Sequence, residues 1–521
     1  MTFGCTANPP PEQNALVNAQ HRATGSSPSA APSSTSPQGK SEPHGQPEQH
    51  GQPAPLIIRT AGDVNRVLGL YGSQGTKTKA IILLALGGIF MDAYDFSSIA
   101  FGITAIKAEF GLNGFMTGFV NAAIMIGAVA GAVFGGYLVD RFGRYKLFMA
   151  DMVFFVVAAV GCALAWDAWS LIGFRFIMGI GVGLDLPVAM AFLAEFSKLA
   201  GRGNRSQRVN AWSPAWYIAT GTGYLIVLIV FLLLPMEQHA ILWRIVVGFG
   251  AVPALIVLLV RRRYMAESPQ WLADNGDVSS AVDIMRSHHA LDVVYEAPEA
   301  QQGRAGRARW ANFAELFSPR YRKRTILALC VSVFSTFGYN AVAYGTPLII
   351  TTLFHQGPLV TIMASLIINL CFGALGGLLG MSIVNRFGTR AVTGTGFAIQ
   401  AAALIVLAAV GIPAGGLVVV SIAMLAAFIF AQAGGPGANL MNYATLSYPS
   451  RLRGIGVGFN QAVLRTFSIV SLIAFPMLAA SLSTGVFWIV ACAPLAGAIA
   501  VALIRWDPTG VDVDAEDRAA A

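Results

Sequence analysis

The sequence predicts an all-α membrane protein with twelve transmembrane helices arranged as two lobes of six. Hydrophobic residues make up 55% of the 521 residues and charged residues only 12%, against about a quarter in a soluble globular domain. Twelve apolar segments follow one another, each near the roughly 20 residues that cross about 30 Å of hydrocarbon. Because a bilayer offers no water to the backbone, these segments are expected to be helices.

A polar N-terminal region precedes these segments. Residues 1–55 are rich in Pro, Ser, Gln and Gly and are expected to form a disordered tail. Residues 56–78 are expected to hold a short lead-in helix, because their apolar residues have helical spacing. No signal-peptide pattern precedes the first segment, so this segment is expected to act as its own signal. The twelve segments run approximately over 80–106, 115–138, 145–166, 169–195, 211–234, 241–260, 325–351, 359–384, 391–411, 416–443, 454–480 and 482–505.

A repeated pattern divides the segments into two lobes. Residues 135–146 and 380–388 share the order Gly, four residues, Asp or Asn, then Arg-Phe-Gly. The offset that aligns these stretches also places Asp95 on Asn340, near the middle of the first and seventh segments. A six-helix unit repeated in one orientation is expected of a two-lobed transporter with its site between the lobes at mid-membrane. The predicted lobes are residues 79–260 and 324–506.

Basic residues in the short loops predict the orientation. Lys and Arg cluster after the even-numbered segments, whereas the other loops carry little beyond Lys107. Because basic loops stay on the cytoplasmic side, both termini, the inter-lobe loop 261–323 and the tail 507–521 are expected to be cytoplasmic. The same placement explains the net charge of +8 without a nucleic-acid partner. We expect a monomeric, multi-pass protein of the cell's inner (plasma) membrane, embedded in the lipid bilayer.

Enzymatic chemistry has no support in the sequence. The five cysteines are scattered without a Cys-x-x-Cys pair, and all seven histidines fall in the tail or in loops. An enzyme in the membrane would need such side chains at membrane depth. We therefore expect no enzyme, no cofactor and no bound metal ion.

The loop after the second segment resembles the signature loop of the major facilitator superfamily, and the resemblance covers about residues 77–506. The matching residues are Gly136, Asp140, Arg141, Gly143 and Arg144. The resemblance implies the major facilitator fold and alternating access, with this loop acting as part of a gate that is closed in one state. The other expected gate residues are a carboxylate partner and three second-lobe residues, namely Glu195, Asn385, Arg386 and Arg453.

Two further stretches narrow the resemblance. Residues 266–272 look like the motif of sugar porters and metabolite transporters, with two substitutions. Residues 92–95 together with 183–187 are similar to phosphate:proton symporters. Those carriers have a Tyr, an acid and a Lys where this chain has Leu186, Asn340 and Arg465. The resemblance therefore favours a small organic metabolite over phosphate.

Four charged residues inside the predicted spans need an explanation, because each costs on the order of 2.5–3.5 kcal/mol at mid-membrane. Counting about 1.5 Å per residue places Asp92 near Asp185, and Asp95 near Arg175. We expect Arg175 to neutralise Asp95, either for proton coupling or as a structural pair. Asp185 has no evident cation, so it is the first candidate proton carrier, followed by Asp92. These carboxylates are expected beside a central, water-filled cleft.

The second lobe has no acid in its spans and is expected to supply hydrogen bonds to the substrate. Arg465 would suit a carboxylate, although a position in the inward gate is an equal alternative. The candidate substrate residues are Asn340, Tyr344, Gln432, Asn439, Asn442, Asn460, Gln461 and Arg465.

The sequence as a whole predicts a proton-coupled symporter of a small polar metabolite, with an organic acid as the expected cargo. The alternatives within transport are a sugar or polyol carrier and a phosphate carrier. The alternative of another class is a nutrient sensor built on a transporter fold, which would usually carry a folded cytoplasmic extension.

Overall fold

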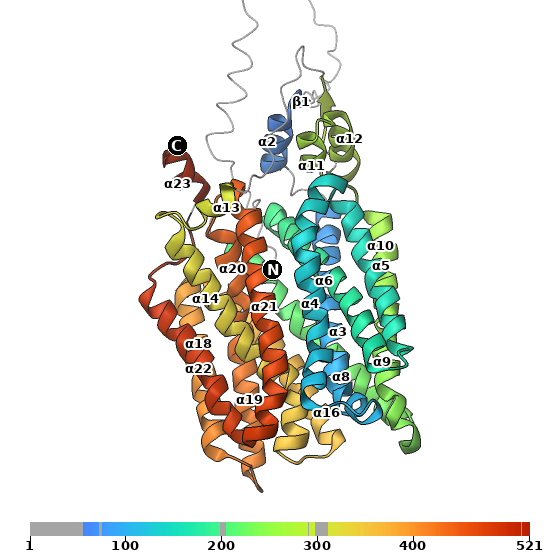
Figure 1. The fold of residues 1–521 in the computed structure, drawn as a ribbon. Helices are drawn as coiled ribbons and strands as arrows, with labels where there is room; N and C mark the ends of the chain where they lie inside the picture. Colours follow the sequence, from blue (N-terminus) through green and yellow to red (C-terminus); the bar gives the residue numbers. More distant parts are fainter. Residues whose placement is uncertain are drawn as a thin grey trace, which may run out of the picture. The chain divides into compact units, whose positions relative to one another are not determined.

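A computed structural model describes residues 56–71, 76–197, 205–289, 291–296, 311–511 and 513–520. The predicted tail, residues 1–55, lies outside the described residues. Among those described, eleven stretches are long and apolar enough to cross a membrane, and one of them, 452–503, contains two helices. The all-α class with twelve spans is therefore confirmed, and the long helices run in nearly the same direction (Figure 1).

The first lobe holds spans one to six. Its α4 and α6 approach each other at glycines, because a Cβ atom at Gly127 or Gly179 would overlap the backbone of the other helix. A short helix, α7 (Arg205–Val209), precedes the fifth span. The spans are α3 (Thr76–Glu109), α4 (Gly114–Phe142), α5 (Arg144–Ala163), α6 (Ala168–Ser197), α8 (Trp212–Leu233) and the sixth, built from η1 (Met236–Ile241), α9 (Leu242–Phe249) and α10 (Ala251–Tyr264).

The second lobe is more irregular, because three of its spans change helix type or break midway. Span seven combines α14 (Arg322–Tyr339), η2 (Asn340–Tyr344), α15 (Thr346–Leu348) and η3 (Ile349–Leu353), where η2 and η3 are π-helical. Span eight combines α16 (Pro358–Leu366), the π-helical η4 (Ile367–Gly373) and α17 (Ala374–Phe387). Span ten breaks at Gly435 between α19 (Leu417–Gly434) and α20 (Pro436–Leu446). The remaining elements are α18 (Thr389–Val410), α21 (Ser450–Leu482), η5 (Ser483–Gly485) and α22 (Val486–Leu503).

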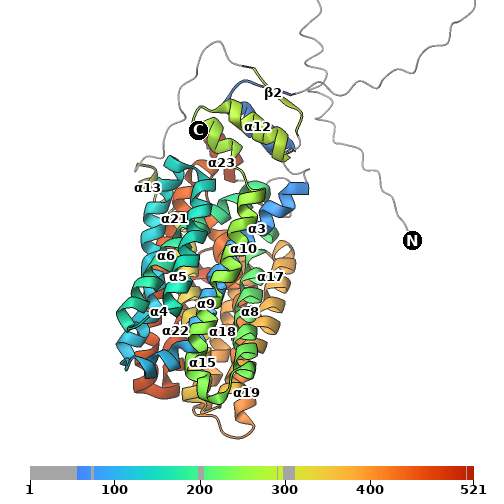
Figure 2. The same cartoon turned by 90° about the vertical axis from the view of Figure 1, so that its right-hand side faces the viewer.

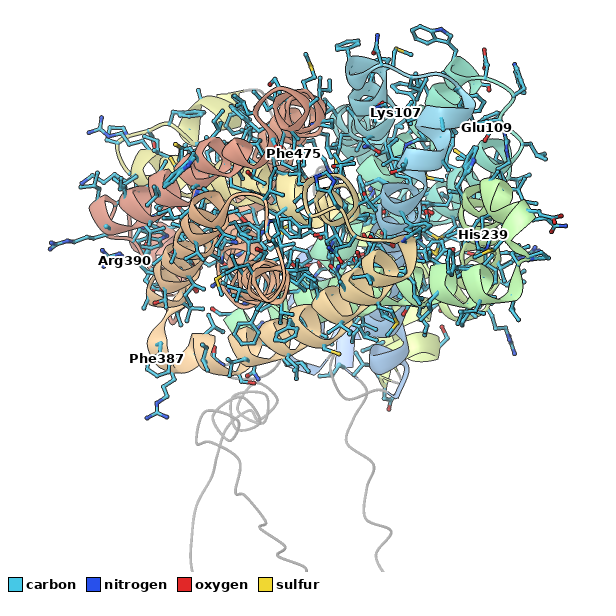
Figure 3. The ribbon with its side chains drawn as sticks, turned by 90° about the horizontal axis from the view of Figure 1, so that it is seen from below. Lys107, Glu109, His239, Phe387, Arg390 and Phe475 are labelled. Atoms are coloured by element: carbon cyan, nitrogen blue, oxygen red, sulfur yellow. The ribbon has the colours of Figure 1, made fainter. Side chains whose placement is uncertain are left out.

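The two halves of the sequence form separate groups of helices. Viewed along the helices, Lys107, Glu109 and His239 lie in the group formed by the first half, and Phe387 and Arg390 lie at the far side of the other group (Figure 3). We call the end of the spans that carries Lys146, Arg262, Arg263, Arg386 and Arg453 the basic end.

A small folded unit at the basic end joins the lead-in segment to the inter-lobe loop. Strands β1 (Leu56–Ile58) and β2 (Val293–Tyr295) pair in parallel, and α2 (Ala61–Tyr71), α11 (Pro269–Asp274) and α12 (Val278–His289) pack beside them (Figures 1 and 2). Its apolar core includes Ile58, Val64, Val67, Ala281, Val282, Met285 and Val293. The lead-in helix was expected, but the strand pairing and the folded loop were not. A folded unit of this kind is the sort of extension that the sensor alternative would require.

The C-terminal segment also folds. Helix α23 (Val513–Ala520) lies at the basic end of the second lobe, where α13 (Ala311–Glu315) is also found (Figure 2). Its acidic side chains pair with basic residues that open spans seven and eleven, with N···O distances of 2.8 Å for Arg324–Glu516 and 3.2 Å for Arg453–Asp514. Residues 507–521 were expected to be only a tail, and this charge complementarity explains the difference.

Candidate functional site

A cavity of about 80 Å³ lies between the two lobes. Spans two and five contribute to its wall from the first lobe, and spans seven, ten and eleven contribute from the second. The lining residues are Met125, Trp212, Ser213, Trp216, Tyr217, Thr336, Tyr339, Asn340, Tyr344, Gln432, Gly437, Leu440, Met441, Gln461, Leu464, Arg465 and Ser468. An apolar and aromatic wall with a few polar groups is typical of a small-molecule site.

Five of the eight candidate substrate residues line this cavity: Asn340, Tyr344, Gln432, Gln461 and Arg465. They come from three helices of the second lobe, as the sequence led us to expect. Their role in binding remains a prediction.

The other three candidates lie away from the cavity lining. The Asn439 Oδ1 atom accepts hydrogen bonds from Asn210 at 2.9 Å and from Asn442 at 3.1 Å. Asn460 accepts a hydrogen bond from Ser332 at 2.9 Å. Asn439 and Asn442 therefore belong to a contact between the lobes on the basic-end side, and Asn460 joins spans seven and eleven.

Irregular helix geometry positions the cavity residues. The π-turn η2 begins at Asn340, so Tyr339, Asn340 and Tyr344 all line the cavity. Such π-turns are frequent at functional sites. The Tyr339 hydroxyl accepts a 2.6 Å hydrogen bond from Trp216, and Tyr344 stacks on Phe96 with 4.9 Å between ring centroids. Tyr339 was not among the predicted site residues, although it lies next to Asn340 in the repeated pattern.

Several polar atoms at the cavity have no strong partner. Among the described residues, the Asn340 Nδ2 donor and the Gln461 Oε1 acceptor make no hydrogen bond. The Arg465 guanidinium donates only to the Met125 sulfur, at 3.3 Å, and no carboxylate in the described part lies within ion-pair distance of it. Since buried polar groups are normally paired, this set is suited to a polar ligand.

The expected ion pair between Asp95 and Arg175 is not formed. Both residues are buried, but Arg175 donates its Nε–H to the Val120 carbonyl at 2.9 Å. Neither oxygen of Asp95 or Asp92 has a hydrogen-bond partner among the described residues. The positive charge of Arg175 still acts on Asp95, although the two side chains do not form an ion pair.

The carboxylates also differ from expectation in their relation to the cavity. Asp92, Asp95 and Asp185 point into the first lobe, at 0%, 2% and 0% exposure, and none of them lines the cavity. Asp185 lies against Gly88, one helical turn before Asp92 on α3, as the depth count predicted, and the charges of Asp185 and Arg465 both act on Asp92. Arg465 thus lines the cavity and also acts electrostatically on one of the buried acids, Asp92.

The prediction that Asp185 lacks a cation is wrong. Its Oδ1 atom accepts a 3.0 Å bond from Arg261, which also pairs with Asp151 at 3.0 Å. Arg261 was assigned to the basic loop because it begins an arginine triplet. Helix α10 instead continues to Tyr264 and turns Arg261 inward, where its side chain is fully buried. Asp151, a lone acid in an apolar segment, was visible in the sequence and was overlooked.

The two copies of the signature loop share one geometry. Gly143 and Gly388 have φ of 92° and 84°, a backbone region that favours glycine. Glu267, which follows span six, accepts a hydrogen bond from the Tyr145 amide at 3.1 Å. Asp507, which follows span twelve, likewise accepts a bond from the Arg390 amide at 3.0 Å. Each loop is thus tied to the end of its own lobe.

The remaining gate residues fall into two groups. Asn385 donates a 3.1 Å hydrogen bond to Gln207 of the first lobe, whereas Arg386 lies beside the Phe387 ring. Arg453 pairs with Asp514 of its own lobe, so it makes no described contact across the lobes. At the other five gate positions the structure describes the backbone alone, so their role stays a prediction: Gly136, Asp140, Arg141, Arg144 and Glu195.

The lobes touch on both sides of the cavity. On the basic-end side, Trp212 donates a 3.2 Å hydrogen bond to the Ala438 carbonyl, in addition to the Asn210–Asn439 bond. Toward the other end, Gly118 lies so close to Ile473 that an added Cβ atom would be 2.8 Å from its Cα. Two six-helix lobes that enclose a mostly apolar cavity with a few polar groups define a membrane transporter of the major facilitator type.

Comparison with known proteins assigns the family. The family model described as "Sugar (and other) transporter" matches residues 80–508, and the chain belongs to this family. The putative metabolite transport protein YwtG of Bacillus subtilis is 29% identical over 435 residues, covering 82% of this chain and 90% of that protein. The niacin transporter NiaP of Acinetobacter baylyi is 26% identical over 414 residues, covering 75% and 84%.

A solved structure has the same fold. The proton:xylose symporter XylE from the major facilitator superfamily, bound to 6-bromo-6-deoxy-D-glucose, aligns with a TM-score of 0.68 at 20% identity. The alignment covers 85% of this chain and 99% of that one. The family match, together with the membrane-spanning helices, identifies the protein as a multi-pass membrane transporter and not an enzyme.

Proposed function

We propose that the protein is a proton-coupled symporter of a small metabolite that carries a carboxylate group. The observation that supports this most directly is Arg465, a buried cation at the cavity with no carboxylate partner in the described part of the chain. Arginine binds carboxylates through two parallel hydrogen bonds, which gives both strength and orientation. The free Asn340 donor and Gln461 acceptor supply hydrogen bonds for the rest of the ligand.

Charge balance links the proton to the substrate. In the empty cavity, Arg465 and Asp92 together are neutral when both are ionised, and each acts on the other. An anion that binds Arg465 adds a negative charge to a dry region, which is costly. Protonation of Asp92 removes that charge. Proton and anion therefore favour each other's binding, which is the thermodynamic requirement for symport.

A sugar or polyol is the second candidate substrate. The amides of Asn340, Gln432 and Gln461, together with the Trp216 ring, are groups that bind hydroxylated rings. The solved neighbour XylE is a proton:xylose symporter, and the relative NiaP is a transporter of niacin, itself a carboxylic acid. The two relatives thus represent the two candidate classes, and Arg465 favours the acid.

We further propose that the transporter acts as a monomer in the plasma membrane with the basic end in the cytoplasm. The arginines and lysines of that end support this orientation, since basic loops are retained on the cytoplasmic side. Both described chain ends, β1 and α23, would then be cytoplasmic.

The test uses purified transporter in liposomes with an imposed pH gradient, screened with radiolabelled nicotinate, other monocarboxylates, D-xylose and polyols. We expect accumulation of a carboxylate that a protonophore abolishes. Replacing Arg465 with glutamine removes a charge-assisted bond of about 1.5–3 kcal/mol, which is roughly a 10- to 150-fold rise in KM for the acid.

The matched control is Lys107→Asn, which also removes a positive charge. Lys107 lies in the last turn of α3 and does not line the cavity. Accumulation of sugars alone, unaffected by Arg465→Gln, would favour the second candidate. Transport that ignores the pH gradient would refute proton coupling.

A further inference from the structure

Three charged side chains from three different spans meet in the core of the first lobe. Arg261 of α10 donates through Nη1 to both oxygens of Asp151 in α5, at 3.0 and 3.1 Å. Its Nη2 donates to Asp185 Oδ1 in α6, at 3.0 Å. All three side chains are fully buried. We call Asp151, Arg261 and Asp185 the triad.

The triad has one acid more than it has bases. When all three groups are ionised, a net negative charge remains in the low-dielectric interior. Buried charges of this kind are stable only when paired or neutralised. One cation cannot neutralise two carboxylates, so the arrangement favours a proton held between them.

The two carboxylates are near enough to exchange that proton. They bind the two terminal nitrogens of one guanidinium group, and the charge of each carboxylate acts on the other. The Asp185 Oδ2 atom makes no hydrogen bond in the described part of the chain and is available as an acceptor. Arg261 further donates to the Phe148 carbonyl at 2.8 Å and lies over the Phe148 ring, which fixes its orientation.

A contact with α3 connects the triad to the cavity side. The Asp185 carboxyl group lies directly against Gly88, where no side chain intervenes. Asp92 is one helical turn further along the same helix, so both positions share a face. Asp92 in turn interacts with Arg465 at the cavity. The order of groups from the cavity is therefore Arg465, Asp92, Asp185 and Asp151.

The opposite side of the triad leads to the basic end. Arg261 lies three residues before Tyr264, where α10 ends, and Arg262 and Arg263 are already exposed. The charged groups that face Asp151 from the helices packed on α5 are Arg261 of α10 and Asp185 of α6.

We propose that Asp151 is the last carrier of the coupled proton before it leaves the first lobe at the basic end, and that Arg261 is a positioning residue for it. This inference rests on the proposed symport function. In each step an O–H bond breaks at one carboxyl group and forms at the next, from Asp92 to Asp185 and then to Asp151. The final acceptor is water at the basic end, and each donor is left as a carboxylate.

The test compares Asp151→Asn with wild type and with Asp151→Glu, which keeps the carboxyl group. The variant Asp151→Asn leaves Arg261 and Asp185 as a one-to-one pair, so folding is expected to be retained. The control Asp283→Asn removes an acid whose side chain is 77% exposed. Two transport modes are measured in liposomes, namely accumulation driven by a pH gradient and counterflow exchange without a gradient.

We expect Asp151→Asn to lower gradient-driven accumulation at least tenfold while counterflow stays within twofold of wild type. Asp151→Glu and Asp283→Asn should keep both modes. A merely structural role for Asp151 would lower both modes together or neither, and either result would overturn the proposal. If wild type itself shows counterflow but no response to the gradient, the proposed symport function fails instead.

A measurement without substrate supports the same decision. Infrared difference spectra of the purified protein, recorded between acid and neutral pH, report protonated carboxyl groups. We expect one buried-carboxyl band to be lost in Asp151→Asn and kept in Asp283→Asn. Identical spectra for wild type and Asp151→Asn would overturn the proposal, even if the variant were unstable in liposomes.

Discussion

The contact between Gly88 and Asp185 allows a sharp stability test. A Cβ atom at Gly88 would lie 2.5 Å from Asp185 Oδ1 and would overlap Oδ2. At the neighbouring Gly87, the nearest atom to an added Cβ would be a Val257 methyl at 3.4 Å, which is ordinary contact. Gly88→Ala is therefore the perturbation and Gly87→Ala the control. Both replace glycine by alanine in one helix, so the change in helix propensity cancels.

The expected magnitude follows from these distances. An added Cβ atom would lie 1.9 Å from Asp185 Oδ2, so the carboxyl group must withdraw by about 1.5 Å to reach ordinary contact, which stretches its bond with Arg261 Nη2 from 3.0 Å beyond hydrogen-bonding range. A charge-assisted hydrogen bond contributes about 1.5–3 kcal/mol, and overpacking costs about 1–3 kcal/mol. We expect Gly88→Ala to destabilise the protein by about 3–6 kcal/mol relative to Gly87→Ala.

The assay is thermal unfolding of both variants in the same detergent, followed by loss of the monodisperse peak in gel filtration. Gly88→Ala should melt clearly below Gly87→Ala and should also lose proton-driven accumulation. Equal melting temperatures would refute the reasoning, because Asp185 would then not be held against α3 by Arg261.

Three further predictions concern the basic end. Ile58→Ala removes a fully buried side chain from β1 and should destabilise the small folded unit by about 2–4 kcal/mol, seen as faster hydrogen exchange in β1 and β2. Asp277 caps α12, and hydrogen bonds from Ser280 hold the pKa of its carboxyl group below the usual value, so α12 should lose protection as the pH falls below about 4. Gly143→Ala should destabilise the signature loop by at least about 1–2 kcal/mol, measured by thermal unfolding, because φ is 92°.

Each of these predictions has a matched control. Ile57, 57% exposed, should tolerate alanine, and equal exchange rates for Ile57→Ala and Ile58→Ala would contradict the packing of this unit. Asp277→Ala should greatly reduce the pH dependence of α12, since the carboxylate that caps the helix and has the lowered pKa is then absent. Gly454 has open space around it, so Gly454→Ala should not destabilise; a similar loss at Gly143 and Gly454 would argue against backbone strain.

Hydrophobicity alone predicted the twelve spans to within a few residues, because helix length and apolar composition are set locally by the bilayer. Simple depth counting also placed Asp185 near Asp92 correctly. Helix rotation was harder to predict. Arg261 begins an arginine triplet that resembles a loop. Because α10 continues to Tyr264, the triplet is helical, and successive side chains point in different directions. Arg261 therefore points into the lobe while Arg262 is exposed.

Long-range pairings were beyond reach of the sequence. The strands β1 and β2 have three residues each, too few for a period, and their register depends on a partner more than 200 positions away. The candidate substrate residues lie on the second-lobe helices that line the cavity, but three of the eight occupy turns of those helices that do not face it. Asn439 and Asn442 lie just past the Gly435 break, which rotates them toward Asn210 and out of the lining.

Among the residues whose burial is described, the buried acids all belong to the first lobe, whereas most of the cavity wall comes from the second. Under the proposed function, the side chains that select the substrate and those that carry the proton lie in different halves of the chain. Substitutions in spans seven, ten and eleven would then change the substrate while the proton-carrying residues of the first lobe stay the same. Related carriers would acquire new substrates through changes in one half of the chain.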